Sequence, residues 1–183
     1  MPLLPRREPN ESTGDFHRRR ARFAAFLLLL LLPATLWLFA RVGHIWPNIA
    51  SLEGAPFMVA ATALGALLAV LPIALVTTLL VAVWHGVESV FQPRSHATPT
   101  ADRLIVATGI LVWFSPSLAL LAWAVRAIAQ GAIRFTRPAR EYLLATDPLA
   151  FWQGIGFLLI VAAALAYPAW HYWRSRLAKA ARH

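Results

Sequence analysis

The stretch from Phe23 to Ala40, FAAFLLLLLLPATLWLFA, contains eighteen residues and no charge. At 1.5 Å per residue, a helix of this length covers about 27 Å of the ~30 Å hydrocarbon core of a bilayer. Its six consecutive leucines, Leu27 to Leu32, together favour insertion by roughly 2 to 4 kcal/mol. The stretch is also longer than the ~7 to 15 apolar residues of a secretory signal peptide. It therefore predicts a retained transmembrane helix.

Three further stretches have the same character. Together with the first, they give four predicted spans at about 23–41, 57–84, 104–126 and 149–171. Between the terminal residues of these spans there is no Asp, Glu, Lys, Arg or His. The chain as a whole is 59% hydrophobic and 14% charged, which differs from an ordinary soluble domain. The sequence predicts an all-α integral membrane protein whose transmembrane domain covers residues 23–173.

Basic residues gather at the two ends of the chain. Residues 1–22 carry three prolines, six arginines and three acidic residues, which predicts a disordered basic tail, and residues 174–183 form a second basic tail. If the N-terminus is cytoplasmic, twelve of the 17 Lys and Arg residues lie on the cytoplasmic side. The positive-inside rule then predicts a multi-pass protein of the bacterial inner membrane with both termini in the cytoplasm.

Small residues recur along one face of the second span. Ala61, Gly65 and Ala69 are spaced by four residues, so they share a face of a helix. Such a stripe lets a second helix approach closely in a membrane. We expect these three residues to form a helix-packing face.

Hydroxyl side chains lie within the apolar spans. Ser115 and Ser117 flank Pro116, and their hydroxyls can donate to carbonyls that the proline leaves without a partner. With Thr77 and Thr78 of the second span, they could instead line a polar path. Hydrogen bonding to the backbone of the same or a neighbouring helix is the more common role of such residues.

The segment from Ala129 to Thr146 joins the third and fourth spans, in the second outer loop. After Pro138, the stretch Ala139–Ala145 combines charged residues with tyrosine and leucine. This mixture predicts a short interfacial helix.

Arginines also lie in and beside this outer loop, against the positive-inside tendency. Arg126 ends the third span, and Arg134, Arg137 and Arg140 follow. Because the planar guanidinium suits phosphate and carboxylate groups, this cluster of four is a candidate for contact with anionic lipid head groups or with an acidic partner, and Arg134, Arg137 and Arg140 are its contact candidates. The arginines are explained equally well if they bind nothing and the short connection simply tolerates them.

Histidines stand at the predicted cytoplasmic ends of two spans. His85 follows the second span and His171 ends the fourth, and two neutral imidazoles on facing helices can bind haem iron or another metal. A histidine beside a tryptophan at the interface is more often an amphipathic anchor. His85 and His171 therefore remain haem or metal candidates, while the sequence predicts no bound cofactor and no metal.

Several function classes do not fit this sequence. The chain has no cysteine, which excludes disulfides, thiolate metal sites and a cysteine nucleophile. Its acidic residues and histidines show no recognised catalytic spacing, so we expect no enzyme. Its arginines flank apolar spans and do not alternate with stacking aromatic residues, so we expect no nucleic-acid partner.

After these exclusions, the sequence favours a non-enzymatic inner-membrane component of a bacterial multi-protein assembly, such as secretion or conjugation machinery. Its expected partners are the lipid bilayer and other membrane proteins or further copies of itself. Two alternatives stay open. One is a small oligomeric transporter or channel, and the other is a haem-binding or quinone-reactive membrane subunit that uses His85 and His171.

Overall fold

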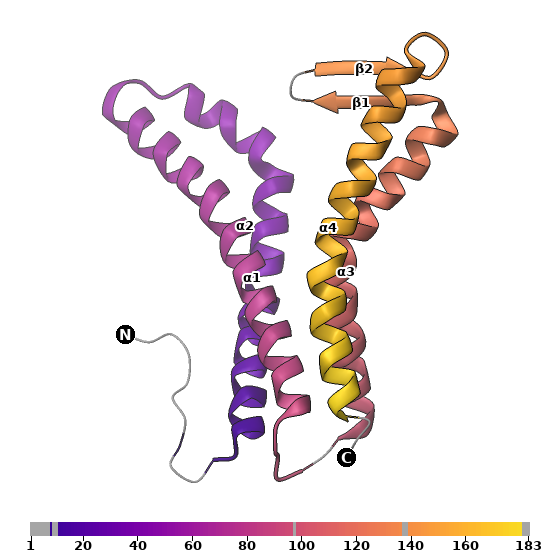
Figure 1. The fold of residues 1–183 in the computed structure, drawn as a ribbon. Helices are drawn as coiled ribbons and strands as arrows, with labels where there is room; N and C mark the ends of the chain where they lie inside the picture. The colour runs from indigo at the N-terminus through magenta and orange to yellow at the C-terminus, as the bar shows by residue number, and fades with distance from the viewer. Residues whose placement is uncertain (1–7, 9–10, 97, 137–138, 181–183) are drawn as a thin grey trace. The chain divides into compact units, whose positions relative to one another are not determined.

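The computed structural model describes residues 8, 11–96, 98–136 and 139–180. These residues form, in chain order, α1 (Thr13–Ala50), α2 (Gly54–Phe91), α3 (Pro99–Gln130), β1 (Ala132–Thr136), β2 (Ala139–Leu143) and α4 (Pro148–Ala180), as Figure 1 shows. Each helix contains one predicted span and is long and apolar enough to cross a membrane. The prediction of four helices of transmembrane length is confirmed.

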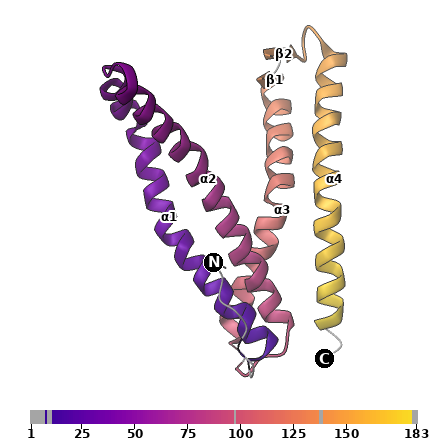
Figure 2. The ribbon, with the colours of Figure 1, turned by 90° about the vertical axis from the view of Figure 1, so that its left-hand side faces the viewer.

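The chain forms two compact units, residues 1–106 and 107–183. The first unit contains α1, α2 and the start of α3, and the second contains the rest of α3, both strands and α4. In the first unit, α1 and α2 form an antiparallel pair (Figures 1 and 2). In the second, α4 continues through residues 174–180, which the sequence assigned to a basic tail.

Helix α1 includes residues 13–22, where the sequence predicted a disordered tail. Ser12 caps this helix, because its Oγ accepts a hydrogen bond from the backbone N–H of Asp15 at 3.2 Å. The Arg19 guanidinium pairs with the Glu11 carboxylate at 2.7 Å. Capping and ion pairing therefore order a segment whose composition alone indicates no packed core.

The connection between α3 and α4 is a β-hairpin, so the short interfacial helix predicted for Ala139–Ala145 is wrong. Strands β1 and β2 pair antiparallel, from Ala132 opposite Leu143 to Thr136 opposite Ala139. The hairpin lies at the end of the unit where α3 stops and α4 begins (Figures 1 and 2).

Alternation of side chains explains why this segment forms strands. Buried Ile133 and partly buried Phe135 pack against the helices, while Arg134 between them lies on the other face of the hairpin and pairs with Glu141. This period of two suits a half-buried strand. Gly131, at a φ of +63°, supplies the left-handed turn that leads from α3 into β1.

A small apolar core holds the hairpin against the helices. A Cβ atom at Gly154 of α4 would lie 3.2 Å from Ile133 Cδ1 and 3.5 Å from the Phe135 ring, so the glycine allows the hairpin to approach the helix closely. The buried members of this core are Ala124, Ala127, Ile133, Phe151, Ile155 and Leu158. The core fixes the position of β1 relative to the end of α3, where a pocket forms.

Candidate functional site

Charged side chains gather in the first unit, where the start of α1 meets the loop after α2 and the start of α3. Both terminal nitrogens of Arg94 donate to the Asp102 carboxylate at 2.8 Å, and Arg18 donates to the same carboxylate. The Asp102, Arg94 and Arg18 side chains are only 13%, 11% and 15% exposed. We call these three residues, with Asp15 and Ser95, the junction cluster. Bidentate, charge-assisted hydrogen bonds of this kind are among the stronger contacts in proteins.

A second carboxylate of the junction cluster joins α1 to the loop. The Asp15 carboxylate accepts hydrogen bonds from the Ser12 hydroxyl at 2.6 Å, from the Ser95 hydroxyl, and from the Ser95 backbone N–H at 3.1 Å. These hydrogen bonds, those of the two hydroxyls first, lower the pKa of Asp15 to about 2. Hydrogen bonds from Arg94 and then Arg18 lower the pKa of Asp102 as well. Both carboxylates are therefore ionised at neutral pH.

Two histidines meet beside this cluster. The Nδ1 atoms of His17 on α1 and His85 on α2 lie 2.7 Å apart, so one ring donates to the other and the accepting ring is neutral. Glu88 and Ser89, which follow His85 on α2, are buried. The structure thus gives His85 a partner on α1 that the sequence did not suggest, because residues 1–22 read as a disordered tail.

His171, the other haem or metal candidate, belongs to the second unit. Its ring stacks on that of Tyr167, one turn earlier on α4, with ring centroids 6.4 Å apart. Within the described part of the chain, no three His, Asp or Glu side chains group so that they could hold a metal ion. Haem binding by His85 and His171 therefore stays a prediction.

The two described arginines of the hairpin, Arg134 and Arg140, do not share one surface. The Arg134 Nε donates to Glu141 at 2.7 Å, and the Arg140 guanidinium lies 3.5 Å from the Tyr142 hydroxyl. Because Arg134 is paired with Glu141 and Arg140 with Phe135, their side chains lie on opposite faces of the hairpin. Arg137, the third candidate, lies outside the described residues.

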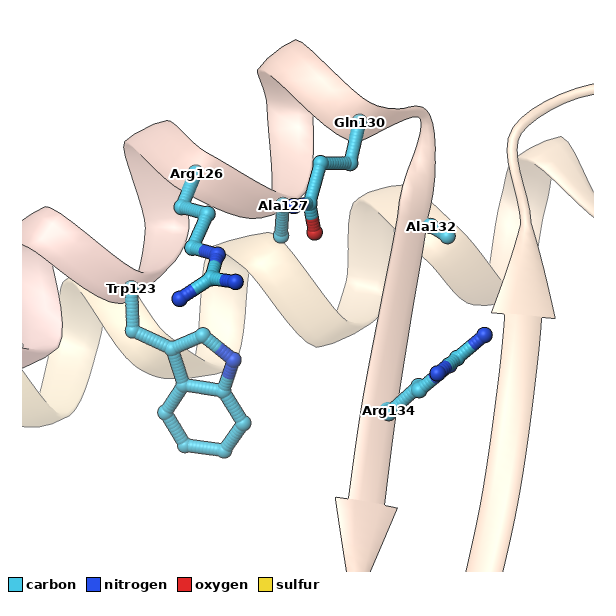
Figure 3. Close-up of a pocket in the computed structure, with 6 residues that line it drawn as sticks. All are labelled: Trp123, Arg126, Ala127, Gln130, Ala132 and Arg134. Atoms are coloured by element: carbon cyan, nitrogen blue, oxygen red, sulfur yellow. The ribbon is translucent and has the colours of Figure 1, made fainter.

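Arg134 instead contributes to a pocket between the end of α3 and β1. The pocket has a volume of about 480 Å³ (Figure 3). Arg126 and Trp123 project from α3 on one side of it, and Arg134 lies on β1 (Figure 3). Its lining residues are Trp123, Arg126, Ala127, Gln130, Ala132 and Arg134.

The predicted packing stripe on α2 is not covered in the structure. Gly65 and Ala69 are exposed and Ala61 is only partly buried, whereas the neighbouring Leu64 is buried. A Cβ atom added at Gly65 would meet nothing within 4 Å. The α2 surface at Gly65 is therefore left open.

Hydroxyl groups in the spans donate to backbone carbonyls. Ser115 Oγ donates at 2.9 Å to the carbonyl of Val112, the residue four positions before Pro116, as the sequence predicted. Ser117 Oγ crosses instead to the Ala162 carbonyl of α4 at 2.8 Å. These contacts are the structural role that we expected for such residues, and they link α3 to α4 within the second unit.

Comparisons with protein families, curated proteins and solved structures find no match to this chain.

Sequence reasoning missed the junction cluster and the pocket for the same reason. Arg18 and Asp102 are 84 residues apart, and the pocket joins the end of a helix to a strand that was read as part of a loop. The only local signal was charge at the ends of spans, which topology alone explains. A contact between two segments that are far apart in the sequence leaves no recognisable sequence pattern in either of them.

Proposed function

We propose that this chain is a non-enzymatic component of a multi-protein assembly in the bacterial inner membrane, with both termini in the cytoplasm. The observation that carries the proposal is the uncovered stripe of Ala61, Gly65 and Ala69 on α2. In the most apolar stretch of 18 residues in α2, no residue is buried. The occupant that we propose for this face is a transmembrane helix of a different membrane protein.

The physics of membranes supports this use of the stripe. Lipid tails are as apolar as leucine side chains, so helices associate in a bilayer mainly through close packing and interhelical hydrogen bonds. Small residues make close packing possible because they let two backbones approach. An exposed stripe with open space above Gly65 is therefore suited to a helix that the chain itself does not supply.

The test is purification of the tagged chain from its host in mild detergent, followed by mass spectrometry of the proteins that remain bound. We expect a stoichiometric partner for the native chain and at least a fivefold loss of that partner for Gly65→Leu. Gly156→Leu on α4 is the matched control, because a Cβ atom at Gly156 also meets nothing within 4 Å. We expect it to retain the partner.

Other outcomes would favour the alternatives. Recovery of the chain with copies of itself only would favour the small oligomeric transporter or channel, and a Soret absorption band would favour the haem-binding subunit. A stoichiometric partner retained equally by Gly65→Leu and Gly156→Leu would contradict the role of the α2 stripe. Thermal midpoints of both variants equal to that of the native chain in detergent would show that neither change disturbs the fold.

The orientation has its own test, because the chain has no cysteine of its own. Ser51 and Ser175 are exposed, and the hydroxyl of each donates to a carbonyl three residues earlier, so they form a matched pair. We expect Ser51→Cys to react with a membrane-impermeant maleimide in spheroplasts, and Ser175→Cys to react only after permeabilisation. The reverse labelling pattern would place both termini outside the cytoplasm and contradict the orientation.

A further inference from the structure

We propose that the pocket between the end of α3 and β1 binds the phosphate of an anionic phospholipid. The pocket lies within the second unit and is lined by two arginines, a glutamine amide and an indole ring (Figure 3). Its volume of about 480 Å³ is large enough for a phosphate group together with part of a glycerol head group. This inference does not depend on the proposed assembly.

The hydrogen-bond donors of the pocket include two arginine side chains. Among the described residues, Arg126 makes no hydrogen bond and no ion pair, and its guanidinium projects beside Trp123 toward the pocket (Figure 3). Arg134 uses only its Nε atom for Glu141, which leaves its two terminal nitrogens as donors. Glu141 offsets one of the two positive charges, so a ligand with one negative charge balances the site.

The chemistry of these donors points to phosphate. A guanidinium presents its N–H groups in a planar fork that matches two oxygens of a phosphate. The amide of Gln130, one turn after Arg126 on α3, adds a donor at the same place. A phosphodiester, with two equivalent charged oxygens, satisfies these groups with a single negative charge.

The position of the pocket selects a lipid over a soluble anion. Trp123 lines the pocket near the end of the third span, and tryptophan is typical of the level of the lipid head groups. Ala122 and Ala119 lie four and seven residues before Arg126, so they share its face of α3, and both are exposed. Small side chains below the pocket leave a shallow apolar surface on which an acyl chain can lie.

The hairpin supplies a matched control. Arg140 carries the same charge and is exposed on the same hairpin, but it lies on the face opposite Arg134 and does not line the pocket. Arg126→Gln and Arg140→Gln therefore change the net charge equally, and only Arg126→Gln alters the lining of the pocket. Since Arg126 makes no hydrogen bond or ion pair among the described residues, its replacement breaks no such contact there.

The experiment is native mass spectrometry of the full chain in a non-ionic detergent, titrated with phosphatidylglycerol, with phosphatidylcholine of the same acyl chains, and with inorganic phosphate. We expect phosphatidylglycerol to bind at least fivefold more tightly than phosphatidylcholine. We expect Arg126→Gln to weaken phosphatidylglycerol binding about tenfold, and Arg140→Gln to change it less than twofold. Inorganic phosphate at the same concentration should not displace the lipid.

Three results would overturn the proposal. Equal effects of Arg126→Gln and Arg140→Gln would mean that the lipid responds to net charge and not to the pocket. Displacement of the lipid by equimolar inorganic phosphate would make the pocket a site for soluble anions. Unchanged lipid binding in Arg126→Gln, together with loss of a co-purifying protein, would assign the pocket to an acidic protein surface.

Discussion

Replacing Asp102 with asparagine is expected to lower the free energy of unfolding of the first unit by about 3 kcal/mol. The change keeps the shape of the side chain and removes its charge, so Arg94 and Arg18, which are 11% and 15% exposed, lose their anionic partner. Two positive charges are then left close together in a place where little water reaches them. Leaving such charges unpaired costs far more than losing an exposed ion pair.

Two measurements test this expectation. The first is the unfolding midpoint of purified protein in mixed micelles titrated with a denaturing detergent. The second is the rate of trypsin cleavage after Arg94, which should rise in Asp102→Asn because the loop is released from α1 and α3. The hydrogen bonds from Arg94 also lower the pKa of Asp102, so the native carboxylate is fully ionised when both measurements are made at neutral pH.

An exposed ion pair in the second unit gives the matched control. Arg134 and Glu141 are joined at 2.7 Å, but their side chains are 78% and 42% exposed. We expect Glu141→Gln to cost less than about 1 kcal/mol, because solvent screens such a pair. If Asp102→Asn proved as mild as Glu141→Gln, the junction cluster would not be a stabilising contact.

The four long helices could be predicted because each span is decided by its own residues. In the span that begins at Phe23, every residue up to Ala40 is uncharged, and no distant contact is needed to make that stretch insert as a helix. The described helices contain all four predicted spans. Their extra turns carry the polar residues that the sequence placed in tails and loops, and these turns depend on capping and ion pairs.

The hairpin shows where local patterns fail. Read alone, Ala139–Ala145 has the mixed composition of an interfacial helix. Its actual conformation depends on β1, since Glu141 pairs with Arg134 and Tyr142 lies opposite Ile133. A strand needs a partner for its backbone groups, and a pattern within seven residues cannot show whether that partner exists.

The candidate lipid contacts illustrate the same limit. The sequence grouped Arg134, Arg137 and Arg140 because they are close along the chain. In the hairpin, Arg134 and Arg140 face opposite ways, and Arg134 instead lines the same pocket as Arg126, which lies near the end of α3. Contact of these arginines with lipid stays a prediction, and of the two described ones only Arg134 lines the pocket.

Gly14→Ala is expected to disrupt the junction where α1 meets the loop after α2, at a cost of about 2 to 4 kcal/mol. The Gly14 N–H is one of the first-turn donors of α1, and it donates to the Pro93 carbonyl at 2.9 Å. A Cβ atom at Gly14 would lie 2.6 Å from that oxygen and 2.9 Å from the Gln92 carbonyl oxygen, and would also overlap Arg94 Cγ. Since two of these three atoms belong to the backbone, the loop must move away as a whole.

The same substitution at Gly43 separates this contact from the general effect of alanine on a helix. Gly43 lies inside α1, and a Cβ atom there would meet nothing within 4 Å. Alanine restricts the unfolded chain more than glycine does, so Gly43→Ala should stabilise the protein by about 0.5 to 1 kcal/mol. The two variants are thus expected to shift the unfolding midpoint in mixed micelles in opposite directions. Only Gly14→Ala should also accelerate trypsin cleavage after Arg94, because only that change pushes the loop away from α1. Shifts of the same sign would mean that the start of α1 does not pack against residues 92–94, and the ion pairs of Asp102 would then have to hold the junction alone.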